Sequence, residues 1–301
     1  MTIKDIAKQC SVSVSTVSRV LNDRPDVSDD VRRKVRAAIK DSNYIPNNSA
    51  RDLVRTKSDT IGLVVRGVQN PFYTDIIRAI EHKLDLAGYT MVMRQIASCD
   101  DEVKCGAVME REKRLQGLIF LGGRSDYSPA ELALLNVPFV CCTYTNAYGT
   151  LDPSKYSSVS IADEQEAYRA VMELAKKGHR RIAFIHGERT TVTENRLTGF
   201  YRACDALGLE IPEEYVREGV YHDPDRCAEL TRELLQLPEP PTCILMPDDF
   251  SSIGGGNAIR RMGLRFPEDV SAAGYDGIQL ASVTNPAMTT YRQDTAALGK
   301  T

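Results

Sequence analysis

Hydroxyl side chains followed by an arginine are concentrated near the start of the chain. Residues 12–22 read Val-Ser-Val-Ser-Thr-Val-Ser-Arg-Val-Leu-Asn, which places hydroxyls on the first turn of a short helix and Arg19 one turn later. Hydroxyl and backbone N–H donors at a helix N-terminus can bind phosphate oxygens. An arginine on the same face can reach the edge of a guanine. The spacing therefore favours a contact with DNA, and it leaves open a Ser/Thr-rich loop between two ordinary surface helices.

Three short helices are predicted to position these residues. Thr2 caps the first helix, with Asp5 placed to assist, and this helix ends near residues 10–11. Ser13 caps the second helix, and the third begins after Ser28. Two short helices joined by a tight turn and closed by a third form a helix-turn-helix unit. The inward faces, at helical spacing, carry Ile3, Ile6, Ala7, Val17, Val20, Leu21, Val31, Val35, Ala38 and Ile39.

The next segment, residues 44–57, is predicted to be a linker. Asn48 or Ser49 could cap one or two helical turns that carry Ala50 and Leu53. Such a helix is too short to be stable alone. Its apolar residues therefore need a partner, which could be the rest of the chain, a second chain or DNA.

The net charge of −3 hides an uneven distribution. Residues 1–60 hold 12 Lys and Arg against 8 Asp, a net charge of +4, so the remainder carries −7. A basic head on an acidic body is expected when only the head contacts a polyanion.

Composition excludes several classes of protein. The 301 residues, 42% of them hydrophobic, suffice for two domains with buried cores. No apolar run is long enough to span a bilayer and no signal peptide is recognisable, so we expect a cytoplasmic protein. The eight cysteines include no C-x-x-C pair and the four histidines are scattered. We therefore expect neither a metal, nor a disulfide, nor a cofactor.

From Thr60 onward, short apolar runs alternate with helical periodicity. This alternation predicts parallel sheets covered by helices on both faces, in two α/β subdomains that meet after residues 157–161. Ligands bind such folds at the carboxyl ends of the strands, here in the cleft between the subdomains. The predicted strands are 61–65, 90–95, 117–121, 137–141, 181–185, 216–220, 242–246 and 270–274, and the predicted helices are 76–88, 101–115, 129–136, 163–177, 195–207, 224–236 and 250–262.

Three stretches of the sequence resemble the lactose-repressor (LacI/GalR) family. They are the opening Thr-Ile-Lys-Asp-Ile-Ala, the run from Val12 to Asn22, and Tyr44-Ile-Pro-Asn followed by Ala50-Arg-x-Leu53. The resemblance extends through the rest of the chain. It implies an all-α helix-turn-helix head followed by an α/β core of two doubly wound subdomains, similar to periplasmic sugar-binding proteins. The implied divisions are residues 1–45 for the head, 46–58 for a hinge-helix linker and 59–301 for the core.

The resemblance also implies which residues contact DNA. Val14, Ser15 and Arg19 match positions that read bases in the major groove. Leu53, on a hinge helix with Ala50, matches a leucine that wedges into the minor groove when the chain dimerises. Other residues match family positions that contact phosphates or position the second helix on the DNA: Thr2, Ser13, Thr16, Ser18 and Asn22.

Two departures from the family pattern concern the head. Ser11 stands in a turn where many members carry glycine, and mild backbone strain is expected there. The small pair Val14-Ser15 provides no bidentate base reader. Specificity should therefore depend on Arg19, on contact of Val14 with a thymine methyl group, and on DNA shape.

In the core, the resemblance implies a pocket for a small effector, with a sugar or sugar derivative favoured over a purine or nucleoside. Aspartate and arginine together satisfy vicinal hydroxyls, and an aromatic face covers the apolar side of a ring. Asp248 replaces the asparagine that many sugar-binding members carry. The matching residues are Asn70, Phe72, Tyr73, Asp163, Arg196, Tyr221, Asp248 and Asp276.

Each of these pocket assignments has a structural alternative. Asp163 and Asp249 are placed to cap helices. Arg196 can pair with Glu194 on a solvated face, and Tyr221 can serve packing alone.

The function implied is an effector-controlled transcriptional regulator, most often a repressor, that binds palindromic double-stranded operator DNA as a homodimer. Members of the family usually continue further, through a helix and closing strands, so the sequence is expected to be truncated at its C-terminus. A pure small-molecule binding protein is a second hypothesis, which the head and the absence of a signal peptide disfavour.

A nucleotide-dependent enzyme is the third hypothesis. Its candidate features are the glycines at 122–123 and 254–256 and the terminal Gly299-Lys-Thr301. A phosphate loop needs a glycine five residues before Gly-Lys-Thr, where Asp294 stands, and no G-x-G-x-x-G follows the first strand. No Ser/His/Asp or Cys/His spacing indicates nucleophilic catalysis. We therefore predict that the protein is not an enzyme.

Overall fold

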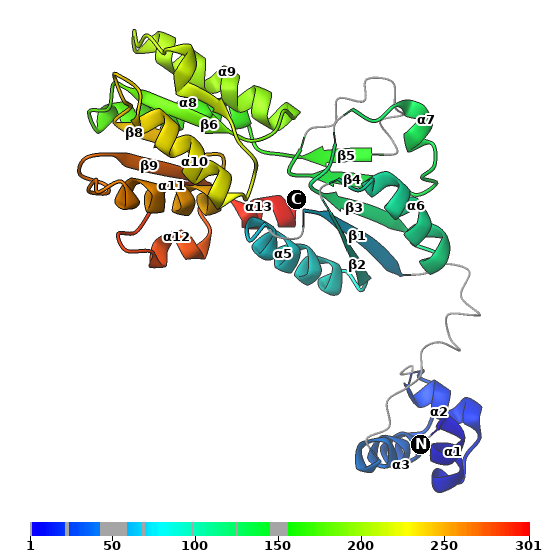
Figure 1. Cartoon of the computed structure of the whole chain (residues 1–301). Helices are drawn as coiled ribbons and strands as arrows, with labels where there is room; N and C mark the ends of the chain where they lie inside the picture. Colours follow the sequence, from blue (N-terminus) through cyan, green and yellow to red (C-terminus); the bar gives the residue numbers. More distant parts are fainter. Residues whose placement is uncertain are drawn as a thin grey trace. The chain divides into compact units, whose positions relative to one another are not determined.

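The computed structural model of the chain describes residues 2–21, 24–42, 59–67, 70–97, 99–124, 126–144 and 156–301 (Figure 1). Contacts within the chain divide it into two units, Met1–Ser58 and Asp59–Thr301. None of the helices in the described ranges is both long and apolar enough to cross a membrane.

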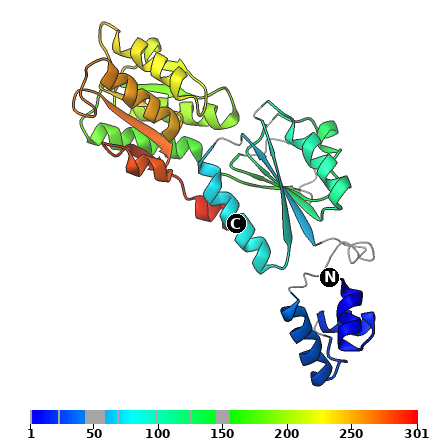
Figure 2. The ribbon, with the colours of Figure 1, turned by 60° about the horizontal axis from the view of Figure 1, so that its bottom comes forward.

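The first unit contains the three predicted helices, α1 (Ile3–Cys10), α2 (Val14–Leu21) and α3 (Asp29–Asp41) (Figure 2). Thr2 and Asp5 form a reciprocal capping box on α1. The side chain of Ser13 accepts a hydrogen bond from the backbone N–H of Thr16 at the start of α2. Each helix contributes to one small core, because the periodic apolar positions converge. Its fully buried residues include Ile6, Val17 and Val35.

The turn between α1 and α2 has the expected strain. Ser11 adopts a left-handed conformation with φ of 53°, a region that glycine enters without a side-chain penalty. Its backbone N–H donates to the carbonyl of Lys8, which closes the end of α1. Asn22, Ala50 and Leu53, and with them the predicted hinge helix, lie outside the described residues.

The second unit begins with a five-stranded sheet whose order is β2-β1-β3-β4-β5, all parallel. This is the doubly wound pattern, in which the second strand is added on one side of the first and the later strands are added on the other side. The elements are β1 (Thr60–Arg66), α5 (Phe72–Leu86), β2 (Thr90–Ile96), α6 (Glu102–Lys113), β3 (Gly117–Leu121), α7 (Pro129–Leu132), β4 (Phe139–Cys142) and β5 (Tyr156–Val159).

A second parallel sheet follows, with order β10-β9-β8-β6-β7, which repeats the pattern of the first. The predicted fold class, a helix-turn-helix head and two doubly wound subdomains, is confirmed. The elements are α8 (Asp163–Lys176), β6 (Ile182–His186), α9 (Thr191–Ala206), η1 (Glu213–Tyr215), β7 (Val216–Glu218), α10 (Pro224–Leu235), β8 (Cys243–Leu245), α11 (Asp249–Arg261), β9 (Ser271–Asp276), α12 (Gln279–Val283), β10 (Thr289–Arg292) and α13 (Thr295–Lys300).

Several predicted boundaries differ from the structure. The strand β10 and the helix α12 were not predicted, because the residues of β10 are polar, partly exposed and lie at a sheet edge. The helix α7 is a single turn, shorter than the predicted 129–136. The helix α9 begins at Thr191, four residues before the predicted start. Its N-terminus is set by the Thr190 cap, whereas the prediction relied on the spacing of apolar residues.

Both sheets are buried on two faces. In β1, Val64 packs on the side of α6, whereas Leu63 and Val65 pack on the side of α5. In β6, Ile185 packs with α10 and α11, whereas Phe184 packs with α8 and α9. This two-sided burial explains why the central strands read as continuous apolar runs rather than alternating ones.

The chain crosses between the subdomains twice within residues 156–301. The first crossing leads from β5 to α8. The second leads from β10 back to α13, which packs against α5 of the first subdomain through Leu298 and Gly299 (Figures 1 and 2). A side chain at Gly299 would lie 2.9 Å from the carbonyl oxygen of Ile76, so the two helices approach closely only because glycine stands there.

A similar close approach joins α8 and α9. A Cβ atom at Gly199 would lie 2.0 Å from the carbonyl oxygen of Glu164, which is backbone and cannot move aside as a side chain can. Replacing glycine by alanine inside a helix ordinarily stabilises it by about 1 kcal/mol. We expect Gly199→Ala to lower the free energy of unfolding instead, by about 1–3 kcal/mol, because the helices must separate.

Urea unfolding followed by circular dichroism measures this effect. The control is Thr198→Ala at the neighbouring exposed position of α9, which should change stability by less than about 0.5 kcal/mol. A Gly199→Ala variant as stable as the parent would contradict the close approach.

Candidate ligand cleft and nucleic-acid interface

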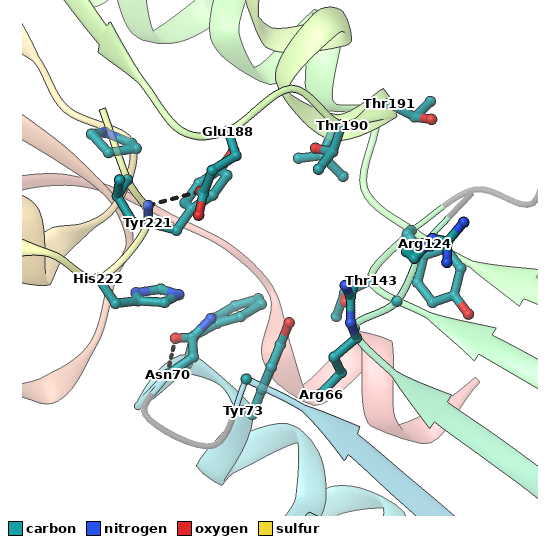
Figure 3. A pocket seen from close by; sticks show the side chains of 18 of the residues that line it. Arg66, Asn70, Tyr73, Arg124, Thr143, Glu188, Thr190, Thr191, Tyr221 and His222 are labelled. Atoms are coloured by element: carbon teal, nitrogen blue, oxygen red, sulfur yellow. Dashed lines mark hydrogen bonds between the residues drawn. The ribbon is translucent and has the colours of Figure 1, made fainter. Parts of the chain in front are cut away.

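A cavity of about 1260 Å³ lies between the two subdomains of the second unit (Figure 3). Many of its lining residues follow strands of both sheets, since parallel pairing brings the carboxyl ends of the strands to one edge. The volume exceeds the range of about 300–1,000 Å³ typical of small-molecule pockets. Of the predicted effector contacts, the following line it: Asn70, Phe72, Tyr73, Asp163, Arg196, Tyr221 and Asp276.

Arg196 and Asp163 form a buried ion pair at this cavity. The Nε of Arg196 donates to Asp163 Oδ1 at 2.9 Å, and its Nη1 donates to the carbonyl of Pro247 at 3.0 Å. The guanidinium also lies over the ring of Tyr275, 4.4 Å from its centre. Nη2 makes no hydrogen bond to a described residue, so it is the nitrogen available to a ligand. Arg196 therefore does not pair with Glu194 on a solvated face.

Asp163 is the first residue of α8 rather than its cap. Its side chain is 7% exposed. Burial raises the pKa of Asp163, and the neighbouring Arg196 opposes that rise. Because the helix begins at this residue, the positive end of α8 adds a second favourable interaction for the carboxylate.

Asp276 ends β9 and faces the same cavity. Its backbone has a φ of 102°, which is unusual for a residue with a side chain. Burial raises the pKa of Asp276 to about 7. Its Oδ1 accepts a hydrogen bond from the side chain of Gln293, which also lines the cavity. Gln293 was not predicted, and it lies on the second crossing between the subdomains.

Asp248 does not line the cavity, although it was predicted to contact the effector. Its carboxylate caps α11 by accepting from the N–H and the hydroxyl of Ser251, and it accepts from the N–H of His222. Burial favours a higher pKa for Asp248, but the imidazole of His222 and these hydrogen bonds outweigh burial and hold the pKa below its usual value. Asp248 is therefore placed to orient His222.

His222 is a cavity residue that the sequence analysis missed. Its Nδ1 lies 3.5 Å from Asp248 Oδ1. Burial alone would lower the pKa of His222, but the adjacent Asp248 raises it above its usual value. The neighbouring Tyr221 donates its backbone N–H to Glu188 and shares a hydrogen bond with Thr193 through its hydroxyl. Tyr221 thus lines the cavity and also packs against Gly187.

The wall from the first subdomain carries two arginines that were not predicted. Figure 3 shows Arg66, Tyr73 and Arg124 on one side of the cavity, opposite Glu188, Tyr221 and His222. Arg66 Nε lies 3.5 Å from Oε2 of Glu102, a fully buried carboxylate. Arg124 lines the same wall and donates its backbone N–H to the other oxygen of Glu102.

Tyr73 and Asn70 lie beside these arginines. Burial raises the pKa of Tyr73 to about 12, so its hydroxyl is neutral and can donate. A Cβ atom at Gly122 would lie 2.4 Å from that hydroxyl, which explains the glycine after β3. The side chain of Asn70 accepts from the N–H of Phe72 at 2.9 Å and so shapes the start of α5.

The candidate nucleic-acid interface is the exposed face of α2. Ser13 shares hydrogen bonds with the hydroxyls of Ser15 and Thr16, at 2.7 and 2.8 Å. Val14 is 40% exposed, although it is apolar. Arg19 is exposed and lies 3.3 Å from Asp26. A surface that presents an apolar side chain among hydroxyls and an arginine has the chemistry needed in a major groove.

Within the described residues, no three histidine, cysteine or acidic side chains are grouped so that they could hold a metal ion. Buried carboxylates instead pair with arginine, histidine or backbone N–H groups, as at Asp163, Asp248 and Glu102. The polar side chains of the cavity are therefore arranged to form hydrogen bonds with a ligand.

Comparison with known proteins agrees with this arrangement. Residues 2–47 match the bacterial regulatory proteins of the lacI family, and residues 171–301 match a periplasmic binding protein-like domain. The HTH-type transcriptional regulator MalR of Clostridium butyricum is 36% identical over 307 positions, which cover 100% of this chain and 90% of the relative. The chain belongs to the lacI family of bacterial regulatory proteins.

Solved structures of lacI-family proteins share the fold. The lac repressor dimer bound to operator and the anti-inducer ONPF has a TM-score of 0.82 and 28% identity, covering 100% of this chain and 89% of that one. A complex of the transcriptional regulator CelR with cellobiose has a TM-score of 0.71 and 28% identity, covering 100% and 90%. This lacI-family chain is accordingly a DNA-binding transcriptional regulator and not an enzyme.

Titration of Asp276 should make the stability of the core depend on pH. Its pKa is about 7 in the fold against an ordinary value of 3.8, so the folded chain binds more protons than the unfolded one between these values. Stability should therefore fall as pH rises through this range. A protonation difference of one proton changes the free energy of unfolding by about 1.4 kcal/mol per pH unit. We therefore expect the decrease in the free energy of unfolding with pH to be smaller by roughly 2–4 kcal/mol in Asp276→Asn.

Urea unfolding at about pH 5 and pH 8 tests this expectation. Asp249, whose pKa burial raises to about 6, acts in the same direction, so the dependence should shrink rather than vanish. Asp85→Asn, at an exposed position of α5, is the control. An unchanged pH dependence in Asp276→Asn would show that Asp276 is ionised throughout this range.

Proposed function

We propose that this chain is a ligand-responsive repressor that binds a palindromic operator as a homodimer in the cytoplasm. Its effector is a small polyhydroxylated molecule, a sugar or sugar derivative, held in the cleft between the subdomains. The observation that carries this proposal is the buried Arg196–Asp163 pair beside Asp276, at the point where both sheets end.

The polar groups of the cleft suit hydroxyl groups. Arg196 and His222 offer donors, while Asp276 and Glu188 offer acceptors on the same wall. A diol can accept from an arginine and donate to a neighbouring carboxylate, so each buried group gains a partner. Aromatic residues, among them Tyr73, can cover the apolar face of a ring. The size of the cavity favours more than one ring, as in the CelR complex with cellobiose.

The two crossings between the subdomains supply the coupling. An effector that binds both walls favours one angle between the subdomains, because it gains contacts only when both walls reach it. Gln293 lies on the crossing between β10 and α13 and donates a hydrogen bond to Asp276. A ligand that hydrogen-bonds to Asp276 in place of Gln293 therefore frees or moves this crossing segment. The change reaches DNA through residues 46–58, where Ala50 and Leu53 form the proposed hinge helix. That helix orders or melts with the change.

In the head, we propose that Val14, Ser15 and Arg19 read bases. Thr2, Ser13, Thr16, Ser18 and Asn22 contact phosphates or place the helix. The side chains of Ser13, Ser15 and Arg19 are exposed and lie outside the small core, which supports this assignment.

Arg196→Lys tests the effector site. Lysine keeps the charge beside Asp163 but loses the planar fork, so effector affinity should fall by roughly 1.5–3 kcal/mol, about tenfold or more. A thermal-shift screen of mono- and disaccharides identifies an effector, and titration calorimetry measures its affinity for both proteins. Arg202→Lys, on an exposed part of the same helix, should bind the effector normally. Equal affinities for all three proteins would exclude Arg196 from the site.

Arg19→Ala tests the proposed base contact. Loss of a guanine contact should cost roughly 1–3 kcal/mol of operator affinity and relax the preference at one base pair. Fluorescence anisotropy with the operator and with single-base variants measures both effects. Arg33→Ala removes an equal charge from the exposed side of α3 and should weaken binding to all duplexes alike. If Arg19→Ala behaves as Arg33→Ala does, Arg19 contacts phosphate and not a base.

A further inference from the structure

The arginine on the DNA-facing helix has an acidic partner. Asp26 Oδ2 lies 3.3 Å from Nη1 of Arg19, and both side chains are more than half exposed. Asp26 is the one described residue with which Arg19 forms an ion pair. We propose that Asp26 is a specificity-determining residue, which positions Arg19 for guanine and disfavours contact of Arg19 with phosphate. This inference rests on the proposed base-reading role of Arg19.

The loop after α2 holds Asp26 in this place. The backbone N–H of Arg24 donates to the carbonyl of Arg19 at 3.0 Å, which folds the loop back onto the end of α2. The side chain of Arg32 in α3 donates to the carbonyl of Arg24 at 2.6 Å. On the other side of Asp26, Val27 packs against the core of the head. Backbone contacts on both sides of Asp26 therefore hold its carboxylate near Arg19. The ion pair does not depend on the side-chain conformations alone.

The geometry leaves Arg19 able to read a base. A guanidinium carries five N–H donors, and the ion pair places Nη1 of Arg19 nearest to Asp26. Nη2 and Nε remain for the O6 and N7 acceptors of guanine, which need two donors side by side. Asp26 thus draws the Nη1 end of the guanidinium toward the loop and reduces the conformational freedom that Arg19 would lose on binding.

The charge of Asp26 adds discrimination. Residues 1–60 have a net charge of +4, which attracts them to any duplex. A carboxylate beside Arg19 repels phosphate oxygens and competes with them for the guanidinium, because both are anionic acceptors. Binding of the head to the sugar-phosphate backbone of DNA alone is therefore weakened. A guanine, in contrast, accepts hydrogen bonds from Arg19 without displacing Asp26. The ratio of operator to non-specific affinity therefore rises while the affinity for random DNA falls.

The experiment compares Asp26→Asn with the parent chain, both full-length. Selection from a random duplex library with the parent first identifies its palindrome. Anisotropy then gives the affinity for that duplex, for each base change at the position read by Arg19, and for a scrambled duplex over a series of salt concentrations. Asp41→Asn, which makes the same change of charge at an exposed position at the end of α3, is the matched control.

We expect Asp26→Asn to reduce the preference for guanine at that one position by about two- to fivefold, the range that an exposed ion pair supports. Binding to the scrambled duplex should tighten, and its salt dependence should steepen by roughly one phosphate contact. Asp41→Asn should tighten binding to all duplexes and leave base preference unchanged. Asp26→Glu, which restores the charge, should recover part of the preference. In an Arg19→Ala background, Asp26→Asn should no longer alter base preference.

Two results would overturn the inference. If Asp26→Asn and Asp41→Asn show the same base preference, Asp26 acts only through its contribution to the net charge. The proposed function is unaffected by that result. Failure of the parent to select any palindrome would remove the proposed function and this inference together. Thermal unfolding of each variant shows whether the head is intact.

Discussion

Parallel strand pairing is the constraint on which the functional architecture depends. In a parallel sheet every strand ends at the same edge, so residues far apart in sequence are brought to one line. Two such sheets face each other across a cavity here, and the side chains that follow β1, β3, β6, β7 and β9 all reach it. The central strands, such as β1 and β6, are apolar because helices cover both of their faces. The polar residues gather at the strand ends, where the covering stops.

Buried charge at that edge is stabilised by pairing. Asp163 has Arg196, Asp248 has His222, and Glu102 has Arg66 and a backbone donor. Among the residues that the structure describes, no cation makes a hydrogen bond to Asp276, and its one side-chain donor is the neutral amide of Gln293. The cost of burying it is expressed in its raised pKa, and its φ of 102° adds backbone strain at the same residue. A ligand that brings a hydroxyl donor to Asp276 relieves part of this cost, so the least satisfied group in the cleft is also the most receptive one.

The sequence predicted what depends on local signals. Caps at Thr2 and Ser13 and apolar periodicity located the helices of the head, and continuous apolar runs located the central strands of both sheets. The edge strand β10 has no such run, because only one neighbour and partial cover bury it. Glu102 and Arg66 were not singled out from the sequence. Their burial follows from packing between distant segments, which no local pattern encodes. Asp248 shows the reverse case, a residue at the expected position whose oxygens are occupied by its own helix and by His222.

The return of α13 to α5 makes the first subdomain discontinuous in sequence. During synthesis, the surface of α5 around Ile76 and Ala79 emerges early, but the helix that covers it is made only after the whole second subdomain. The first sheet can form on the ribosome before that cover exists, so an apolar stripe stays open throughout translation of residues 163–292. The first subdomain therefore cannot bury this stripe until the chain has passed through the second subdomain and α13 has packed against α5.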